Sequence, residues 1–419
     1  MFRIGFFLLL IFLLIYIFAE QKNVYCGGDD SDKIKAILVP HAGYKYIEKV
    51  ASWAYNQIKW ENYKHVIILS TNHYNAEIVI PDNHQRFKYP NNLGDLVTKN
   101  DELFMKEHSW QNQLPFLEKA ADKQISVYNV GIFKEDFTNF IYNQIDDTTL
   151  LIANTDLSHC GYAYGNICEN PEKIDDNTII KIRGNQFNFL KNAMCGKAAV
   201  ETFMAILKKK KWPITEYQYD NANENGNRVG YLSMVSKISY EPLLSIPHKV
   251  INKFEVNNVD PVYDENIHSV FVTIMKNNEL RGCIGVYRKK NESLNDMIIE
   301  STNLSAKNDP RFTEIKPQEK QHLTYKISFN HRPELIYSDN KQNLIDTLRN
   351  NIIINVHGIT IEFDDSKSTY LSSVLPEHFD MNGNDTDEKW NKVIDSLTKK
   401  NGNQNKKIKK IYRYISVEY

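Results

Sequence analysis

Histidine and cysteine, two side chains that bind transition metals, are concentrated in four short segments of the first half of the chain. The segments are P-H-A-G-Y at 40–44, T-N-H-Y at 71–74, N-T-D-L-S-H-C at 154–160 and M-C-G at 194–196. Imidazole and thiolate ligands together suit copper, iron or zinc rather than magnesium or calcium. The side chains that could do this chemistry are His41, His73, Asp156, His159 and Cys195.

Three of these segments each follow a brief apolar run that is typical of a buried strand: 35–39, 65–70 and 149–153. Helical patterns lie between the runs, at 46–58 and 133–145. This alternation predicts an α/β domain with a mostly parallel sheet, whose ligand crevice lies beyond the carboxyl ends of its strands. A single histidine after a strand is more often a hydrogen-bonded loop residue than a ligand. Three such strand ends together favour one shared site.

Cys195 directly precedes a helical pattern at 196–207. The positive N-terminal end of that helix should lower the thiol pKa and favour the thiolate, which is the form that binds metals. Four lysines at 208–211 fall where the helix should end. They are expected to form a solvated last turn, which the helix dipole favours.

With these segments the chain resembles the Memo family, whose fold is similar to that of the class III extradiol (LigB-type) dioxygenases. The resemblance runs over 35–239 and includes E-H-S-W-Q-N-Q-L-P-F at 107–116, V-G-I-F at 130–133 and V-G-Y at 229–231. It implies one transition-metal ion, copper or iron, in a pocket that also holds two candidate catalytic residues. The implied metal ligands are His41, His73, His159 and Cys195, and the candidate catalytic residues are Asp156 and His108.

Two positions depart from the family pattern. Tyr74 stands where a second histidine is common, and Gln111 stands where a glutamate is usual. Loss of an acid removes a candidate proton acceptor, which bears on catalysis more than on metal binding. The dioxygenases use two histidines and one carboxylate for iron, whereas here a cysteine is among the candidate ligands. Extradiol ring cleavage therefore does not follow from the shared fold.

Length and composition predict two domains. The 419 residues exceed the usual size of one domain, and a hydrophobic content of 42% is enough to form sizeable cores. The predicted division is a leader at 1–22, a metal-binding domain at 33–240 and a second, α+β domain at 243–419, which starts after a polar, proline-containing stretch at 241–248. The formal net charge of −1 gives no global electrostatic reason to expect nucleic acid or an anionic membrane as a partner.

The leader contains an uncharged apolar run from Ile4 to Ala19, which is typical of a signal peptide or a membrane anchor. Either alternative predicts the secretory pathway, with the protein membrane-anchored or secreted. Five cysteines without framework spacing are, in contrast, unlike a disulfide-built secreted domain. Cys160 and Cys168 could pair locally, which would leave Cys195 for metal and Cys283 buried.

The second domain should contain a β-hairpin, with strands at 269–275 and 280–287 and a K-N-N-E turn whose asparagines tolerate left-handed backbone angles. Here the chain resembles the AMMECR family. The resemblance rests on L-R-G-C-I-G at 280–285, N-D-P-R-F at 308–312, Y-K-I-S at 325–328 and H-G-I-T-I at 357–361. Memo-like and AMMECR-like domains also occur fused or encoded beside a radical-SAM protein, so the resemblance implies such a protein as a partner.

Four residues of this second motif set have side chains that could act together: Arg281, Cys283, Asp309 and Arg311. They could form an anion-binding or nucleophilic pocket. Packing of a free cysteine as a small hydrophobe, beside a structural Arg–Asp network, explains the same residues. The neighbouring glycines at 282 and 285 could admit another backbone or a ligand.

The function that this sequence favours is metal-dependent redox or oxygen chemistry, with copper or non-haem iron, on a small-molecule or peptide substrate. The alternative is a non-catalytic metal-binding or signalling scaffold, which would need the same ligands but no open coordination position.

Overall fold

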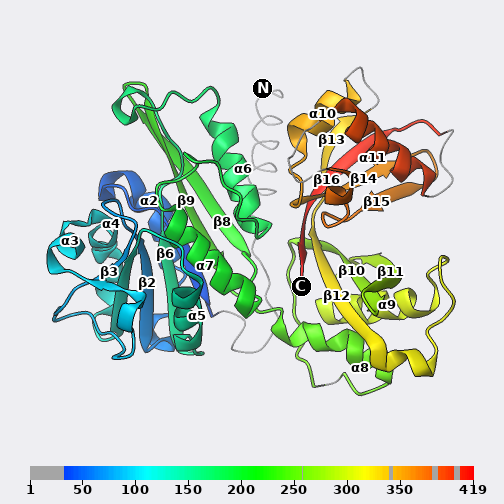
Figure 1. Cartoon of the computed structure of the whole chain (residues 1–419), viewed down its shortest axis with the longest axis horizontal. Helices are drawn as coiled ribbons and strands as arrows, with labels where there is room; N and C mark the ends of the chain where they lie inside the picture. Colours follow the sequence, from blue (N-terminus) through cyan, green and yellow to red (C-terminus); the bar gives the residue numbers. More distant parts are fainter. Residues whose placement is uncertain (1–32, 257, 339–342, 380–385, 401–405) are drawn as a thin grey trace, which may run out of the picture. The chain divides into compact units, whose positions relative to one another are not determined.

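The computed structural model describes residues 33–256, 258–338, 343–379, 386–400 and 406–419 (Figure 1). The predicted leader and Cys26 lie outside these ranges. Within the ranges, every helix is too short or too polar to cross a lipid bilayer.

The first domain is built on a nine-stranded sheet with the strand order β4-β3-β5-β2-β6-β1-β9-β7, and β8 pairs with β9. Its centre is parallel, because β1 pairs with β6, β6 with β2, and β2 with β5. These four strands are β1 (Ala36–Val39), β2 (His65–Thr71), β5 (Gln124–Val130) and β6 (Thr149–Asn154). The mostly parallel α/β sheet predicted from the sequence is confirmed, and the three predicted strands are β1, β2 and β6.

Helices cover both faces of this sheet (Figure 1). Alternate residues of each central strand point to opposite faces, so Ile37 and Val39 pack with α2 while Ala36 and Leu38 pack with α5, α6 and α7. Burial of both faces explains why these strands are unbroken apolar runs. The helices are α2 (Tyr44–Tyr55), α5 (Glu135–Gln144), α6 (Pro171–Arg183) and α7 (Lys197–Lys210).

Antiparallel strands extend the sheet on both sides, with β3 against β5 and β9 against β1. Beyond β9, the short strand β7 pairs with the start of β9 and carries His159. The remaining elements are β3 (Ile78–Ile80), β4 (Thr98–Lys99), α3 (Asp101–Lys106), α4 (His108–Gln111), β7 (His159–Cys160), β8 (Glu216–Glu224) and β9 (Asn227–Ser236). The lysine run forms the last turn of α7 and its cap, as expected.

The second domain is a seven-stranded, antiparallel sheet with the order β11-β10-β12-β16-β14-β15, and β13 pairs with β16. The predicted hairpin is confirmed, because Asn277 and Asn278 turn between β10 and β11 with φ angles of 51° and 68°. The stretch at 241–248 is helical, and Leu243 and Ile246 are buried in the core of this domain.

The strands of this domain are β10 (Ile267–Lys276), β11 (Glu279–Tyr287), β12 (Leu323–His331), β13 (Glu334–Ser338), β14 (His357–Glu362), β15 (Lys367–Tyr370) and β16 (Lys410–Glu418). Its helices are α8 (Ile246–Asn252), α9 (Leu294–Lys307), α10 (Leu344–Asn351) and α11 (Asp387–Lys399). Of these, α9 packs on β10 and β11.

A buried carboxylate on α6 supports the loop that follows β6. Asp175 accepts hydrogen bonds from the Ser158 backbone N–H (3.0 Å), from the Tyr219 hydroxyl (2.8 Å) and from Arg228 Nη1 (2.9 Å). Gly230 makes room for it, since a Cβ atom there would lie 2.3 Å from Asp175 Oδ2. This contact explains why the V-G-Y segment has a glycine at its centre.

Replacing Gly230 with alanine should destabilise the first domain by about 3 kcal/mol, because the methyl group would displace the buried carboxylate and break its ion pair with Arg228. Denaturant unfolding of the full chain measures the change. The matched control is Gly43→Ala, where a new Cβ meets only Tyr46 Cδ2 at 3.8 Å and the change should stay within about 1 kcal/mol. Equal effects of the two variants would contradict the role given to Gly230.

Candidate metal centre

Three of the predicted ligands come together at the carboxyl edge of the first sheet. One ligand atom each from His41, His73 and Cys195 lies within 4.8 Å of the others. His41 follows β1 and His73 follows β2, while Cys195 lies just before α7. The sheet order places β6 between β1 and β2, so the ends of three neighbouring strands meet here, as the sequence predicted.

The orientation of His41 is set by the residue that ends β6. Asn154 Oδ1 lies 2.9 Å from His41 Nδ1, which leaves His41 Nε2 facing Cys195 Sγ at 3.3 Å. A hydrogen bond to one ring nitrogen selects the tautomer and frees the other nitrogen for a metal. Asn154 was not identified from the sequence, although its position at the end of a predicted buried strand was the available signal.

His73 is oriented by Glu107, a buried carboxylate that was also not singled out from the sequence. Glu107 accepts a hydrogen bond from the His73 backbone N–H (2.7 Å), and its other oxygen lies 2.9 Å from His73 Nδ1. The Ser109 backbone N–H donates to the same carboxylate at 2.9 Å, because Glu107 caps α4. An acidic residue directly before the candidate His108 was the signal that could have revealed it.

Cys195 reaches the strand ends because the next residue is a glycine. A Cβ atom at Gly196 would lie 2.3 Å from Thr71 Oγ1 and 2.8 Å from the Asn154 carbonyl oxygen. The Asp156 backbone N–H points at Cys195 Sγ over 3.4 Å, which also favours a thiolate. The close approach of α7 thus depends on the absence of a side chain at Gly196.

The charges of these groups are coupled. Burial alone would raise the pKa of Cys195, but the charge and hydrogen bond of His41, together with a hydrogen bond from His73, lower it to about 5. Burial would lower the pKa of both histidines, but Cys195 and acidic neighbours raise it to about 9 for His41 and about 10 for His73. The predicted thiolate is supported, and the imidazoles of His41 and His73 are the groups that lower its pKa.

Asp156 and His108 lie beside this group rather than in it. Asp156 Oδ1 accepts hydrogen bonds from the backbone N–H groups of His41 (2.8 Å) and Ala42 (3.3 Å). The His108 ring stacks on His73 with centroids 4.7 Å apart, and its side chain is 50% exposed. Burial and the positive charges of His41 and His73 lower the pKa of His108, so its imidazole is neutral near pH 7.

His159, the fourth expected ligand, is not brought into the group. Its Nδ1 lies 3.0 Å from the Leu157 carbonyl oxygen, and its ring meets Tyr164 edge-on with centroids 5.0 Å apart. The physical reason is its strand: β7 lies at the end of the sheet, beyond β9, whereas His41 and His73 follow β1 and β2. His159 is close to Asp156 in the sequence, but its ring lies away from the other candidate ligand atoms.

The two departures from the family pattern have structural roles. The Gln111 side chain donates to the Met105 carbonyl oxygen at 2.6 Å. The Tyr74 hydroxyl donates to the Lys106 carbonyl oxygen at 3.2 Å, with the Lys106 ammonium over its ring. Both side chains therefore tie the β2–α4 region together.

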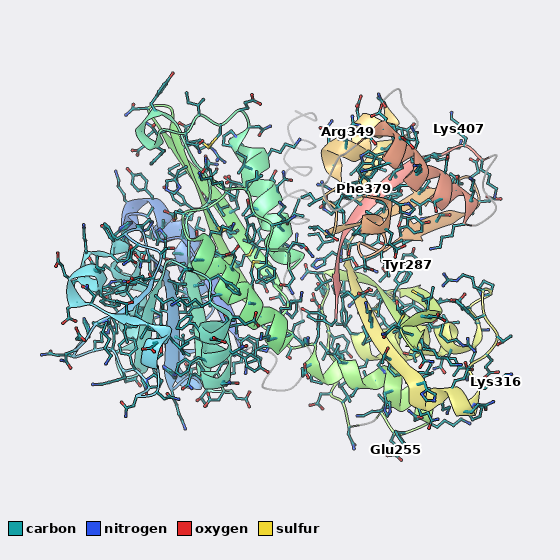
Figure 2. The ribbon with its side chains drawn as sticks, in the orientation of Figure 1. Glu255, Tyr287, Lys316, Arg349, Phe379 and Lys407 are labelled. Atoms are coloured by element: carbon teal, nitrogen blue, oxygen red, sulfur yellow. A yellow bond between two sulfur atoms is a disulfide. The ribbon has the colours of Figure 1, made fainter. Side chains whose placement is uncertain are left out.

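Cys160 and Cys168 form a disulfide, with Cα atoms 5.5 Å apart, as the sequence allowed; Figure 2 draws it as a bond between two sulfur atoms. It closes the loop after β7. Cys195 and Cys283 are not part of a disulfide.

The motif residues of the second domain mostly serve packing and ion pairing. Arg281 forms a two-pronged ion pair with Glu319, both distances being 3.1 Å. A Cβ atom at Gly282 would lie 2.1 Å from the Ser305 carbonyl oxygen of α9, so this glycine admits a helix rather than a ligand. Asp309 accepts from the Cys283 backbone N–H and from Arg311.

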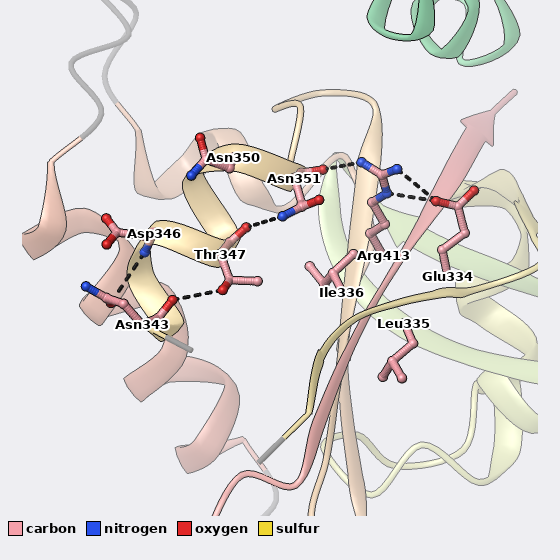
Figure 3. Close-up of a pocket in the computed structure, with 9 residues that line it drawn as sticks. All are labelled: Glu334, Leu335, Ile336, Asn343, Asp346, Thr347, Asn350, Asn351 and Arg413. Carbon is pink, nitrogen blue, oxygen red and sulfur yellow. Dashed lines mark hydrogen bonds and ion pairs between the residues drawn. The ribbon is translucent and has the colours of Figure 1, made fainter. Parts of the chain in front are cut away.

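The second domain also has a pocket of about 570 Å³, between β13 and α10 (Figure 3). Its charged groups are already used: Arg413 Nε donates to Glu334 over 2.9 Å, and Arg413 Nη1 donates to the Asn351 carbonyl oxygen over 2.7 Å. Asn343 caps α10. Among the described residues, the groups that could hold a metal ion lie in the first domain, away from this pocket.

The fold and this site define an α/β domain with a histidine–cysteine cluster that could hold a metal ion, followed by a sheet-rich domain. Family models match both parts: "Memo-like protein" over residues 16–235 and "AMMECR1" over residues 244–419. Because the first match covers more than half of the sequence, the chain belongs to the Memo family, and it carries an AMMECR1 domain in the same polypeptide.

The individual relatives share low sequence identity with this chain. A MEMO1 family protein of Aquifex aeolicus is 28% identical over 33% of this chain and 60% of its own length. A MEMO1 family protein of Metallosphaera sedula is 26% identical over 49% of this chain and 84% of its own length. The crystal structure of the uncharacterised protein PH0010 from Pyrococcus horikoshii is 20% identical, with 42% of this chain and 88% of that chain covered and a TM-score of 0.31.

Replacing Glu107 with glutamine should weaken metal binding roughly 10- to 100-fold, because the carboxylate that orients His73 loses its charge. Competition with a chelator of known affinity measures the effect. The control is Glu102→Gln, the same chemical change at an exposed site on α3, which should leave the affinity unchanged. Equal affinities of the Glu107→Gln variant and the wild type would contradict this role.

Metal affinity should rise with pH between about 6 and 9. At neutral pH both imidazoles carry protons in the metal-free protein, since their pKa values are about 9 and about 10, whereas Cys195, with a pKa of about 5, has lost its proton. A metal binds neutral imidazole and must displace these protons, so each released proton contributes roughly ten-fold in affinity per pH unit. Calorimetric titration in buffers of different ionisation enthalpy counts the protons. Binding without proton release would contradict the assignment of His41 and His73 as ligands.

Proposed function

We propose that this protein binds one copper or non-haem iron ion through His41, His73 and Cys195 and uses it for redox or oxygen chemistry on a small-molecule or peptide substrate. The observation that carries the proposal is the convergence of two imidazoles and one thiolate within 4.8 Å of one another. A thiolate with imidazoles suits copper or iron, both of which change oxidation state.

The arrangement of the ligands supports an open site. Three protein ligands leave a coordination position for a small molecule, as catalytic metal sites generally do. The position of His108 supports access, because its half-exposed ring stacks on His73. When bound, the metal would supply electrons to, or accept them from, a substrate at that position.

Two side chains would handle protons beside the metal. Asp156 is held by two backbone N–H groups, so its carboxylate has a defined position and can orient a ligand or accept a proton. His108 is neutral near pH 7 and can accept a proton from a bound molecule on the exposed side of the site.

The competing function is a non-catalytic metal-binding or signalling scaffold. Gln111 favours it, because an amide that donates to the Met105 carbonyl oxygen supplies no acid or base. In that case the same ligands would sequester the metal, and Asp156 would act only by keeping the His41 backbone in place.

The disulfide supports placing the first domain in an oxidising compartment, since disulfides persist there and are rare in the cytosol. This location would agree with the secretory route that the apolar run from Ile4 to Ala19 predicts.

The two functions are separated by measuring metal content and oxygen consumption, with a reductant present, for the wild type and for Asp156→Asn. The variant keeps an oxygen that can accept from His41 N–H but removes the charge. If the protein is an enzyme, turnover should fall roughly 100-fold while the metal content stays near normal. Equal, metal-independent rates would defeat the catalytic proposal and favour the scaffold.

The metal site is tested separately with the His41→Ala, Cys195→Ala double variant, which should lose the stoichiometric ion because two of three ligands are gone. Full metal content in the double variant would refute the site for both functions.

A further inference from the structure

The sheet of the second domain curls so that its two ends face one hollow. In the strand order, β10 and β11 lie at one end and β14 and β15 at the other, with β12 and β16 between them. Side chains from both ends nevertheless line a common hollow, whose wall includes Phe271, Tyr287, Thr369 and Tyr414. Tyr287 is labelled in Figure 2. The inner side of this curl, which Phe271, Tyr287, Thr369 and Tyr414 line, forms the concave face of the domain.

The thiol of Cys283 lies on the concave face. Gly282, its neighbour on β11, faces the opposite way, toward the Ser305 carbonyl oxygen of α9. Because alternate residues of a strand point to opposite faces, Cys283 points away from α9. Its Sγ lies 3.2 Å from Thr273 Oγ1 of the paired strand β10. Gly285, on the same face, lets the Phe271 ring lie flat on β11.

Two cations border this side of the sheet, Arg311 at the backbone of Cys283 and Lys400 at Thr369, which lines the hollow. Arg311 donates from Nη2 to the Cys283 carbonyl oxygen (3.2 Å), and Asp309 holds it through two further bonds of 2.9 and 2.7 Å. Lys400, at the end of α11, donates to the Thr369 carbonyl oxygen at 2.8 Å. Burial and then the charge of Arg311 lower the pKa of Lys400, which is expected when two cations lie close together.

The charge balance leaves a place for an anion. Asp309 is the carboxylate of this cluster, so Arg311 and Lys400 together leave one positive charge uncompensated. Within the described part of the chain, Arg311 Nη1 has no hydrogen-bond partner, and its side chain is 45% exposed. Guanidinium and ammonium groups with free donors recognise carboxylate and phosphate oxygens.

We propose that the concave face of the second domain binds a small oxyanion, a carboxylate or a phosphate, between Arg311 and Lys400 and beside the thiol of Cys283. The neighbouring hollow between Phe271, Tyr287 and Tyr414 has a volume of only about 20 Å³, so the ligand is a small oxyanion without a bulky apolar part. Burial raises the pKa of Cys283, so the neutral thiol is a neighbour of the anion rather than its attacking group. This site is independent of the metal centre.

The test is protection of Cys283 from alkylation in the full-length protein, with the Cys283 peptide separated from the Cys195 peptide by mass spectrometry. Inorganic phosphate and acetate serve as probes, and potassium chloride of equal ionic strength controls for screening. An oxyanion at about ten times its dissociation constant should slow alkylation roughly ten-fold, because only unoccupied molecules react. Protection by phosphate alone or by acetate alone identifies which oxyanion the site accepts.

Variants decide whether the cations are responsible. Arg311→Gln and Lys400→Gln should each abolish the protection, whereas Arg311→Lys, which keeps the charge, should retain part of it. Lys392→Gln is the matched control on α11, since this lysine is 64% exposed and pairs with Glu388. An increase in melting temperature on adding the oxyanion, lost in the same two glutamine variants, provides a second measurement if alkylation is slow. Absence of protection and of stabilisation by both probes, or equal effects with chloride, would overturn the proposal.

Discussion

The candidate metal centre depends on one buried amide, the side chain of Asn154 at the end of β6. Its oxygen lies 2.9 Å from His41 Nδ1 and accepts a hydrogen bond from the Thr71 backbone N–H at 3.0 Å. Its NH₂ group donates to Ser70 Oγ at 2.9 Å and to the Ser109 carbonyl oxygen at 3.3 Å. One side chain thus ties together the ends of β1, β2 and β6 and the start of α4. Loss of such a buried group leaves several polar partners unsatisfied, each at a cost of about 1–3 kcal/mol.

The ionisable side chains of this candidate centre stabilise one another's charged forms. Two raised imidazole pKa values and two lowered acidic ones describe a set in which His41, His73, Cys195 and Glu107 compensate one another's charge, with His41 and Glu107 buried and His73 and Cys195 only partly so. Each ion would be costly to bury alone, and each lowers the cost of its neighbours. A metal cation in place of the two protons would likewise put positive charge beside the thiolate and Glu107.

The motif residues have different structural roles in the two domains. In the first domain, Gly196 and Gly230 permit close approaches that bring Cys195 and Asp175 into place, so their packing serves the site. In the second domain, Gly282 and the Arg281–Glu319 pair serve the contact of β11 with its neighbours. Cys283 belongs to the same motifs but faces the concave side, and Arg311 bonds to its backbone carbonyl oxygen at the edge of the sheet. A motif is therefore a mixture of packing and binding positions, which only the direction of each side chain separates.

The sequence by itself determined the two-domain α/β and sheet-rich architecture, the strands β1, β2 and β6 and the hairpin at Asn277, because apolar periodicity and turn chemistry are local properties. It also pointed to His41 and His73, since residues that follow the parallel strands of one sheet lie near one edge, and to Cys195 as a soft ligand at the start of a helix. Only the tertiary structure decided that His159 stands apart on β7 and that Glu107 and Asn154 orient the histidines. Strand order and side-chain direction arise from contacts between residues far apart in the sequence, so local patterns do not contain them.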